Sequence, residues 1–337
     1  MGKGVFYMKK LISILLSVFM LSIFLNGCSK GSTEKKVDNS KSKTYKVAMI
    51  CDSTISDGGW GAACYNAMVE AAKEKGFETK YTDGLKSADF TSSLRSYADL
   101  GYDLIFAPGN QYSDAVTEVA KDYPNVHFAL LNGNVESSNI VSILPDAEQI
   151  GYMAGALAGL MSKTNTIGFI GGMELDTTKI KLESYEKAAK EVNPNIEVVS
   201  AYAGSFSDTA KGMEIANSMI KTNNVDVMFG DASAVDSGAR QALASNTNTY
   251  DIGQPSDLVP TDETGVIISS IVTDNATMIK ICMDDVKNNT FGGKTIYGNI
   301  ENGCLSVGTF SDKVSKNIQD KYLEIINKIK DGTFISK

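Results

Sequence analysis

A set of polar and aromatic side chains in this chain has the chemistry to hold a small, flat ligand without reacting with it. Aromatic rings stack on the faces of a polar ring system, and Asp and Asn oxygens accept hydrogen bonds from ring N–H groups or sugar hydroxyls. The residues predicted to bind the ligand are Asp57, Trp60, Asn110, Asn132, Phe206, Asp231 and Asp257. Binding of this kind requires no covalent step, cofactor or metal, so the protein is predicted not to be an enzyme.

These residues share a position, because each lies in a segment that follows a strand of the pattern, which for Asp257 is the segment 253–257. Strands are predicted at residues 46–50, 77–81, 104–107, 126–131, 166–170, 197–202 and 225–229, and helices at 62–75, 90–100, 113–121, 147–161, 180–192 and 210–222. This alternation is typical of two parallel-sheet α/β units in tandem. Ligands of such sheets bind beyond the carboxyl ends of the strands, and two facing lobes would place those ends around one cleft.

Several members of the set also have an ordinary structural explanation. Asp57, Asp231 and Asp257 are suited to cap the helices that follow them. Asn110 and Asn132 are suited to tight turns. Trp60, the only tryptophan, follows two glycines, which favours an exposed loop position over a core position.

Histidine and cysteine are poorly placed for catalysis or metal binding. The only histidine, His127, lies in the strand-like run 126–131, and no metal-ligand spacing joins Cys51, Cys64, Cys282 and Cys304. Zinc sites and histidine-dependent triads are therefore disfavoured. We expect the four cysteines to be buried apolar residues, with one disulfide as the alternative.

The N-terminus reads as a bacterial lipoprotein export signal. Lys9 and Lys10 precede an apolar run at residues 11–25, and a small Gly27 precedes Cys28. We expect residues 1–27 to be removed, Cys28 to carry the lipid anchor, palmitate included, and residues 28–44 to form a disordered tether. The folded part would then lie outside the cytoplasm at the cell membrane; an uncleaved N-terminal membrane anchor is the alternative.

The charge of the chain argues against nucleic acid and anionic membrane surfaces as partners, since both attract a basic face. The formal net charge is −8, and removing the three lysines of residues 1–27, a segment without acidic residues, leaves −11. The length remaining after the signal suits two domains.

Three ordered motifs make the chain resemble a known family. Residues 151–159 (GYMAGALAG), 166–173 (TIGFIGGM) and 202–212 (YAGSFSDTAKG) resemble the basic membrane protein (BMP) family of lipoproteins, and the likeness covers nearly all of residues 45–337. The resemblance implies a type I periplasmic-binding fold, in which two doubly wound parallel-sheet lobes face one ligand cleft. It also implies lobes that exchange segments, with crossings near residues 142–145, 270–275 and 300–306. We therefore expect one lobe of residues 45–143 and 275–301 and another of 144–274 and 302–337.

The resemblance also implies roles for individual residues. Phe206, in the Gly-Ser-Phe-Ser-Asp motif, matches the family aromatic that stacks on a base. Asp57 and Trp60 match the acidic and aromatic positions of the first loop, in the branch that carries Asp-Gly-Gly-Trp. Family members of this kind deliver purine nucleosides to an ABC transporter, and some relatives bind free bases or riboflavin.

The chain departs from the family pattern at several cleft positions. Residues 59–61 are Gly-Trp-Gly where nucleoside-binding members have Ser-Phe-Asn, and Asn132 stands where the family has Asp. Pro255 replaces another Asp, with Asp257 two residues on, and Thr273 replaces a lysine. Each lost charge-assisted hydrogen bond removes roughly 1.5–3 kcal/mol of binding energy.

The sequence thus predicts a monomeric, lipid-anchored substrate-binding protein of an ABC importer that captures a purine nucleoside between closing lobes and docks on a permease. Two alternatives stay open. One is a surface-anchored nucleoside hydrolase with Asp57 and Asp231 as acid and base. The other is a ligand-sensing or adhesive surface lipoprotein.

Overall fold

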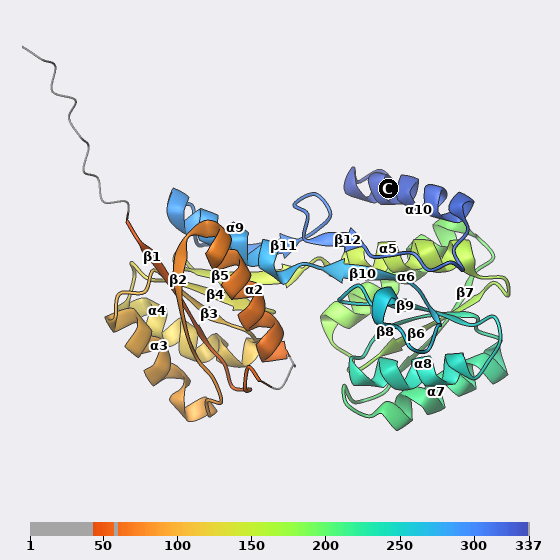
Figure 1. Ribbon diagram of the computed structural model, residues 1–337, viewed down its shortest axis with the longest axis horizontal. Coiled ribbons are helices and arrows are strands. Elements are labelled where there is room, and N and C mark those ends of the chain that lie inside the picture. The colour runs from red at the N-terminus through yellow and green to blue at the C-terminus, as the bar shows by residue number, and fades with distance from the viewer. Residues whose placement is uncertain (1–42, 57–59, 336–337) are drawn as a thin grey trace, which may run out of the picture. The chain divides into compact units, whose positions relative to one another are not determined.

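Two six-stranded sheets, each covered by helices on both faces, organise the chain (Figure 1). The computed structural model describes residues 43–56 and 60–335, and its helices and strands lie in the unit Thr44–Lys337. Residues 1–42, which include the predicted signal and Cys28, and Asp57 lie outside the described residues. Within the described chain, no helix is long and apolar enough to cross a bilayer.

The first lobe is built on a fully parallel sheet with the strand order β2-β1-β3-β4-β5-β11. The strands are β1 (Tyr45–Ile50), β2 (Phe77–Thr82), β3 (Leu104–Ala107), β4 (His127–Leu131), β5 (Ile140–Pro145) and β11 (Lys294–Gly298). The helices are α2 (Trp60–Lys75), α3 (Phe90–Asp99), α4 (Ser113–Asp122) and α9 (Asn275–Asn288), with the short 3-10 turns η1 (Ser87–Asp89) and η2 (Asn110–Tyr112).

The second lobe repeats this order as β7-β6-β8-β9-β10-β12, with β12 antiparallel to β10. Its strands are β6 (Thr166–Gly171), β7 (Glu197–Tyr202), β8 (Val227–Asp231), β9 (Tyr250–Gly253), β10 (Ile267–Thr273) and β12 (Leu305–Val307). Its helices are α5 (Ala147–Met161), α6 (Asp176–Val192), α7 (Thr209–Asn223), α8 (Ala234–Ala244) and α10 (Lys316–Lys330), with the 3-10 turn η3 (Val259–Thr261).

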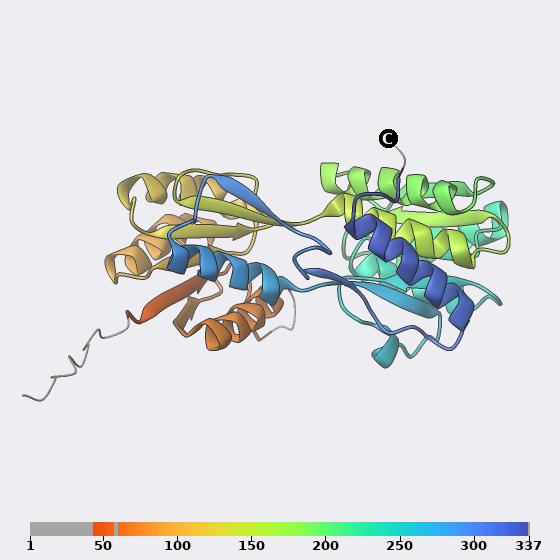
Figure 2. The ribbon, with the colours of Figure 1, turned by 90° about the horizontal axis from the view of Figure 1, so that it is seen from above.

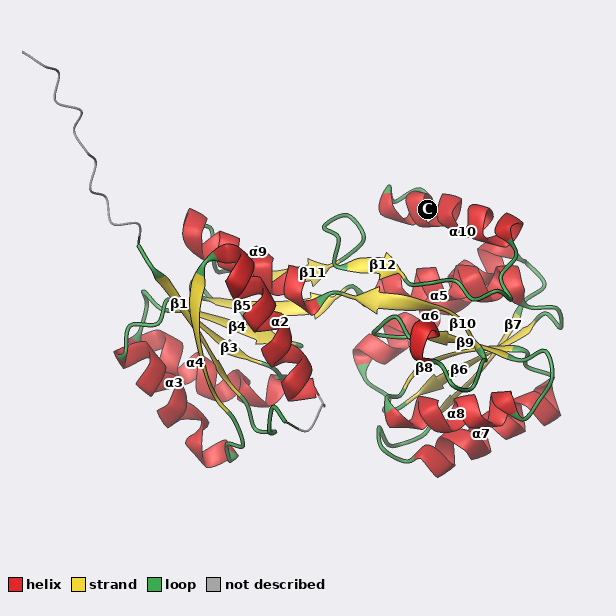
Figure 3. Cartoon of the chain, in the orientation of Figure 1, coloured by secondary structure: helices red, strands yellow, loops and turns green. Residues whose placement is uncertain are grey.

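Residue alternation along the strands explains why both faces of each sheet are covered (Figure 3). In β1, Val47 and Met49 pack on the α2 and α9 side, whereas Ala48 and Ile50 pack on the α3 and α4 side. All four side chains are buried. A strand that is apolar on both faces is typical of a parallel sheet between two helix layers, as the sequence predicts.

The chain crosses between the lobes three times, so neither lobe is one continuous segment. Crossings run from β5 to α5, from β10 to α9 and from β11 to β12. Figure 2 shows α9 and β11 in blue among the red to yellow elements of the first lobe. The crossings are tied together, because Asp146 N–H donates to Gly298 O at 2.8 Å and Asp274 N–H donates to Cys304 O at 2.7 Å.

Helices α5 and α6 approach each other closely because three glycines, one turn apart, face α6. A Cβ atom at Gly151 would lie 2.5 Å from Lys181 O, and one at Gly155 would lie 2.1 Å from Tyr185 O. The contact at Gly159 is looser, at 3.0 Å from Ala189 O. The Gly-rich motif 151–159 therefore serves helix packing. It sets how closely α6, which carries Lys181, lies against α5.

Replacing Gly155 with Ala should destabilise the protein by roughly 1–3 kcal/mol, because the methyl group would overlap backbone that cannot move aside. The loss is expected although Ala is the better helix former. Urea denaturation measures the difference, and Gly159→Ala is the matched control, with a smaller loss expected. Equal stability of Gly155→Ala and the wild-type protein would contradict the packing argument.

Candidate ligand-binding cleft

The strand orders of the two sheets indicate where a ligand would bind. In a doubly wound sheet, ligands bind where loops from adjacent strands leave in opposite directions. That point lies between β1 and β3 in the first lobe and between β6 and β8 in the second. The loops that follow these strands are the ones expected to hold the ligand.

Residues from both lobes line a cavity of about 370 Å³ at these loops, which we call the cleft cavity. The volume falls in the range of small-molecule sites, ~300–1,000 Å³. Of the predicted binding residues, Trp60, Asn132, Phe206 and Asp231 line it. The other lining residues are Pro145, Ile150, Lys181, Ala232, Ser233, Asp236, Arg240, Gln254, Pro255, Thr273 and Asn275.

Trp60 presents its ring to the cleft cavity from the first turn of α2. Its Nε1–H donates to Pro108 O, just after β3, at 2.7 Å. The bond joins the two loops of the first-lobe switch point and fixes the ring, and 42% of the residue stays exposed. An exposed but anchored aromatic ring suits stacking on a ligand.

Phe206 presents a second ring from the second lobe, in the loop between β7 and α7, and is also 42% exposed. The ring lies against Gly172, where a Cβ atom would come within 2.4 Å of it. Phe206 O also accepts from Ala234 N–H at the start of α8, at 3.0 Å. Gly172, directly after β6, therefore makes room for the aromatic ring.

Asp231, at the end of β8, is fully engaged within the protein. Oδ1 is 2.6 Å from Lys181 Nζ and accepts from Gln254 Nε2 at 3.3 Å. Oδ2 accepts from Thr178 Oγ1 at 2.8 Å. Asp231 thus holds Lys181 at the cavity wall, and among the described residues the Lys181 ammonium has no other hydrogen-bond partner, so its remaining N–H donors are available to a ligand.

The remaining predicted residues lie in different surroundings. Asn132 follows β4 in a left-handed conformation (φ 56°), and its side chain is exposed at the cavity. Asn110 does not line the cavity, and its Oδ1 accepts from Ser113 Oγ at 2.8 Å. Asp257 also lies outside the lining and accepts from Thr309 Oγ1 at 2.6 Å, against the loop that follows β12.

The sequence did not single out Lys181, Asp236, Arg240 or Gln254 as cleft residues. Lys181 and Arg240 lie inside helices rather than after strands, so the position rule passes over them. Lys181 places a cation in the same cavity as Thr273, the position where the resemblance implies a missing lysine. Asp236 and Gln254 resemble ordinary helix and loop residues in sequence.

Asp236 is the least well compensated charged group of the cleft. It is 7% exposed, its Oδ2 accepts from Ala232 N–H at 3.0 Å, and its Oδ1 has no partner in the described part of the chain. Burial raises the pKa of Asp236 to about 7, and the negative charge of Asp251 adds to this rise.

A larger cavity of about 890 Å³ adjoins the β5–α5 crossing and α6. It shares only Pro145 with the cleft cavity and lies away from the switch-point loops. The cleft cavity is the candidate ligand site because its walls include residues that follow strands of both lobes. In the described residues, no group of three His, Cys, Asp or Glu side chains could hold a metal ion, and the four cysteines are buried free thiols.

The raised pKa of Asp236 should make stability depend on pH. The folded state keeps the Asp236 carboxyl protonated up to about pH 7, whereas the unfolded state loses this proton near pH 3.8. The stabilisation that comes from holding the proton is therefore full below about pH 4 and is lost as the pH rises through 7. Asp236→Asn should therefore gain stability relative to the wild-type protein between about pH 4 and pH 8. Urea denaturation across that range measures the gap, with exposed Asp114→Asn as the control; a constant gap would contradict the assignment.

Comparisons with known proteins place this geometry in a family. The "ABC transporter nucleoside-binding protein BmpA" of Lactococcus lactis is 29% identical over 96% of this chain and 98% of its own length. Two solved structures show the same fold. A "Transcriptional Activator of comK gene" from Bacillus halodurans has a TM-score of 0.75, with 22% identity over 85% of this chain and 97% of its own. A solute-binding protein from Conexibacter woesei has a TM-score of 0.70, with 21% identity over 87% and 100%.

The predicted two-lobed fold of periplasmic binding proteins is thereby confirmed. The Bmp family model, described as "ABC transporter substrate-binding protein PnrA-like", matches residues 44–337. The predicted resemblance is confirmed as well, and the chain belongs to this family of ABC transporter substrate-binding proteins.

Proposed function

We propose that this protein captures a purine nucleoside outside the cytoplasm and delivers it, as a monomer, to the permease of an ABC importer. The observation that carries the proposal is the pair of exposed aromatic rings, Trp60 and Phe206, that line one cavity from opposite lobes. Two rings on two lobes can enclose a flat base when the lobes close.

The polar groups of the cleft suit the rest of such a ligand. Lys181 offers ammonium N–H donors, and the side-chain amide of Asn132 offers a carbonyl oxygen as acceptor and an NH2 group as donor. These groups can pair with ribose hydroxyls and with the edge of a base. The printed name of the Lactococcus relative, a nucleoside-binding protein, supports the same class of ligand.

We further propose that Cys28 carries a lipid that anchors the protein to the membrane. The basis is the order of Lys9, Lys10, the apolar run and Gly27 before Cys28. An anchored binding protein stays close to its permease, and this raises the effective concentration of the binding protein that the permease meets.

A nucleoside hydrolase is less well supported by the geometry. Both oxygens of Asp231, one of the two carboxylates considered for acid–base chemistry, already accept from Lys181 and Thr178. An adhesin that binds only a protein partner would not need two aromatic rings that line a cavity of ligand size. The binding function therefore fits the described residues best.

Replacing Phe206 with Ala should weaken binding of inosine, guanosine or adenosine by ~1–3 kcal/mol, because a stacking surface is lost. Trp60 is the only tryptophan, so its fluorescence reports the titration directly. Leu323→Ala, which removes an equally exposed apolar side chain on α10, is the matched control and should bind normally. Absence of binding of any purine nucleoside by the wild-type protein would overturn the proposal.

Replacing Cys28 with Ala should abolish lipidation and release the protein from the membrane fraction or leave it unprocessed. Mass spectrometry of the N-terminal peptide and membrane fractionation measure the two effects. Ser29→Ala is the neighbouring control. Unchanged membrane attachment of the Cys28 variant, with an intact N-terminus, would favour the uncleaved anchor instead.

A further inference from the structure

One of the only two arginines of the chain lines the cleft cavity. The other cationic side chains, apart from Arg95, are all lysines. Arg95 lies on the surface of α3 and pairs with Glu118 and Asp122. Arg240 lies in α8 and reaches the cavity wall. Arginine differs from lysine in its planar fork of donors, so its use at this position points to recognition of a planar pair of acceptors.

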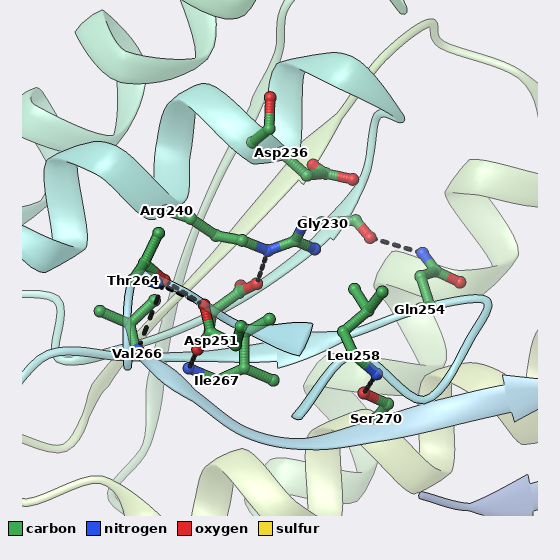
Figure 4. A network of polar contacts seen from close by, with 12 residues as sticks. Gly230, Asp236, Arg240, Asp251, Gln254, Leu258, Thr264, Val266, Ile267 and Ser270 are labelled. Atoms are coloured by element: carbon green, nitrogen blue, oxygen red, sulfur yellow. Dashed lines mark hydrogen bonds and ion pairs between the residues drawn. The ribbon is translucent and has the colours of Figure 1, made fainter. Parts of the chain in front are cut away.

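The guanidinium of Arg240 is held from behind. Its Nε–H donates to Asp251 Oδ2 at 2.7 Å, and Asp251 is itself buried on β9, with 5% of its side chain exposed (Figure 4). Among the described residues, no hydrogen bond engages the two terminal nitrogens of Arg240. The fork is therefore fixed in place while its outer N–H groups are left for a ligand.

The charges around Arg240 favour an uncharged ligand over an anion. Arg240 is paired with Asp251, and Lys181 is paired with Asp231. The remaining ionisable side chain of the cavity lining, Asp236, is acidic and therefore supplies no cation. The cleft cavity thus has no surplus cation to neutralise a phosphate or a carboxylate, and the free N–H groups suit neutral oxygen and nitrogen acceptors.

We propose that Arg240 determines the base specificity of the cleft by donating to two adjacent acceptors of a 6-oxopurine, so that inosine and guanosine bind in preference to adenosine. The inference rests on the proposed nucleoside-binding function. A 6-oxopurine offers O6 and N7 as neighbouring acceptors, the pair that a guanidinium fork contacts with two hydrogen bonds. Adenine places an amino donor where O6 stands, and that donor would face the N–H groups of Arg240.

The test compares the affinities of the full-length protein and its variants for inosine, guanosine and adenosine. The wild-type protein should bind the two 6-oxopurine nucleosides roughly 10- to 100-fold more tightly than adenosine. The double variant Arg240→Gln with Asp251→Asn removes the fork without leaving Asp251 as an unpaired buried charge. It should lose that preference while its affinity for adenosine changes little.

Two further variants separate recognition from structure. Arg240→Lys keeps the positive charge but not the fork, so it should also lose most of the preference. Arg95→Gln removes the surface arginine and should keep it. Thermal melting of each variant verifies that it is folded.

The inference would be overturned if the wild-type protein bound adenosine as tightly as inosine, or if the double variant weakened all three nucleosides equally. In both cases the proposed nucleoside-binding function would stand. If the wild-type protein bound none of the three, the proposed function itself would fail, and the assignment of Arg240 would fail with it.

Discussion

The close approach of α5 and α6 is the contact on which the second half of the cleft depends. Gly151 and Gly155 bring the backbone of α5 against the carbonyl groups of Lys181 and Tyr185. The position of α6 sets where the Lys181 ammonium ends, and Asp231 then holds it at the cavity wall. Because α5 begins directly after a crossing, this packing also joins the cleft to the connections between the lobes. A backbone contact without any functional group thus positions a charged group of the site.

Apart from the carboxyl of Asp236, the charges of the cleft are arranged in pairs that leave little net field for the ligand. Lys181 with Asp231 and Arg240 with Asp251 each cancel within the second lobe, and the aromatic rings of Trp60 and Phe206 carry no charge. Selectivity in such a cavity comes from the shape of the rings and the direction of individual donors and acceptors. This balance suits the neutral, flat nucleoside that we propose as the ligand.

The sequence predicts the architecture well because the signals are local. The doubly apolar strands, such as β1 with Val47 and Ala48 on opposite faces, and the intervening helical segments indicate two parallel sheets directly. The rule that binding residues follow strands places Trp60, Phe206 and Asp231 in the cavity. The same rule misses Lys181 and Arg240, since both lie within helices and reach the cavity only through the packing of α6 and α8. It also includes Asp257, which follows a strand but pairs with Thr309. Such partnerships depend on segments distant in sequence, and no local pattern reports them.

The late position of β11 and β12 in the chain has a consequence for synthesis. β11 pairs with β5, with Lys294 opposite Val141, and β12 pairs with β10. A nascent chain that ends before residue 294 therefore carries two sheets whose β5 and β10 edges are open, and open edges are templates for aggregation. Pairing across more than a hundred residues also slows folding. The first sheet is thus complete only once residues 294–298 are available to pair with β5, and the second only once residues 305–307 pair with β10.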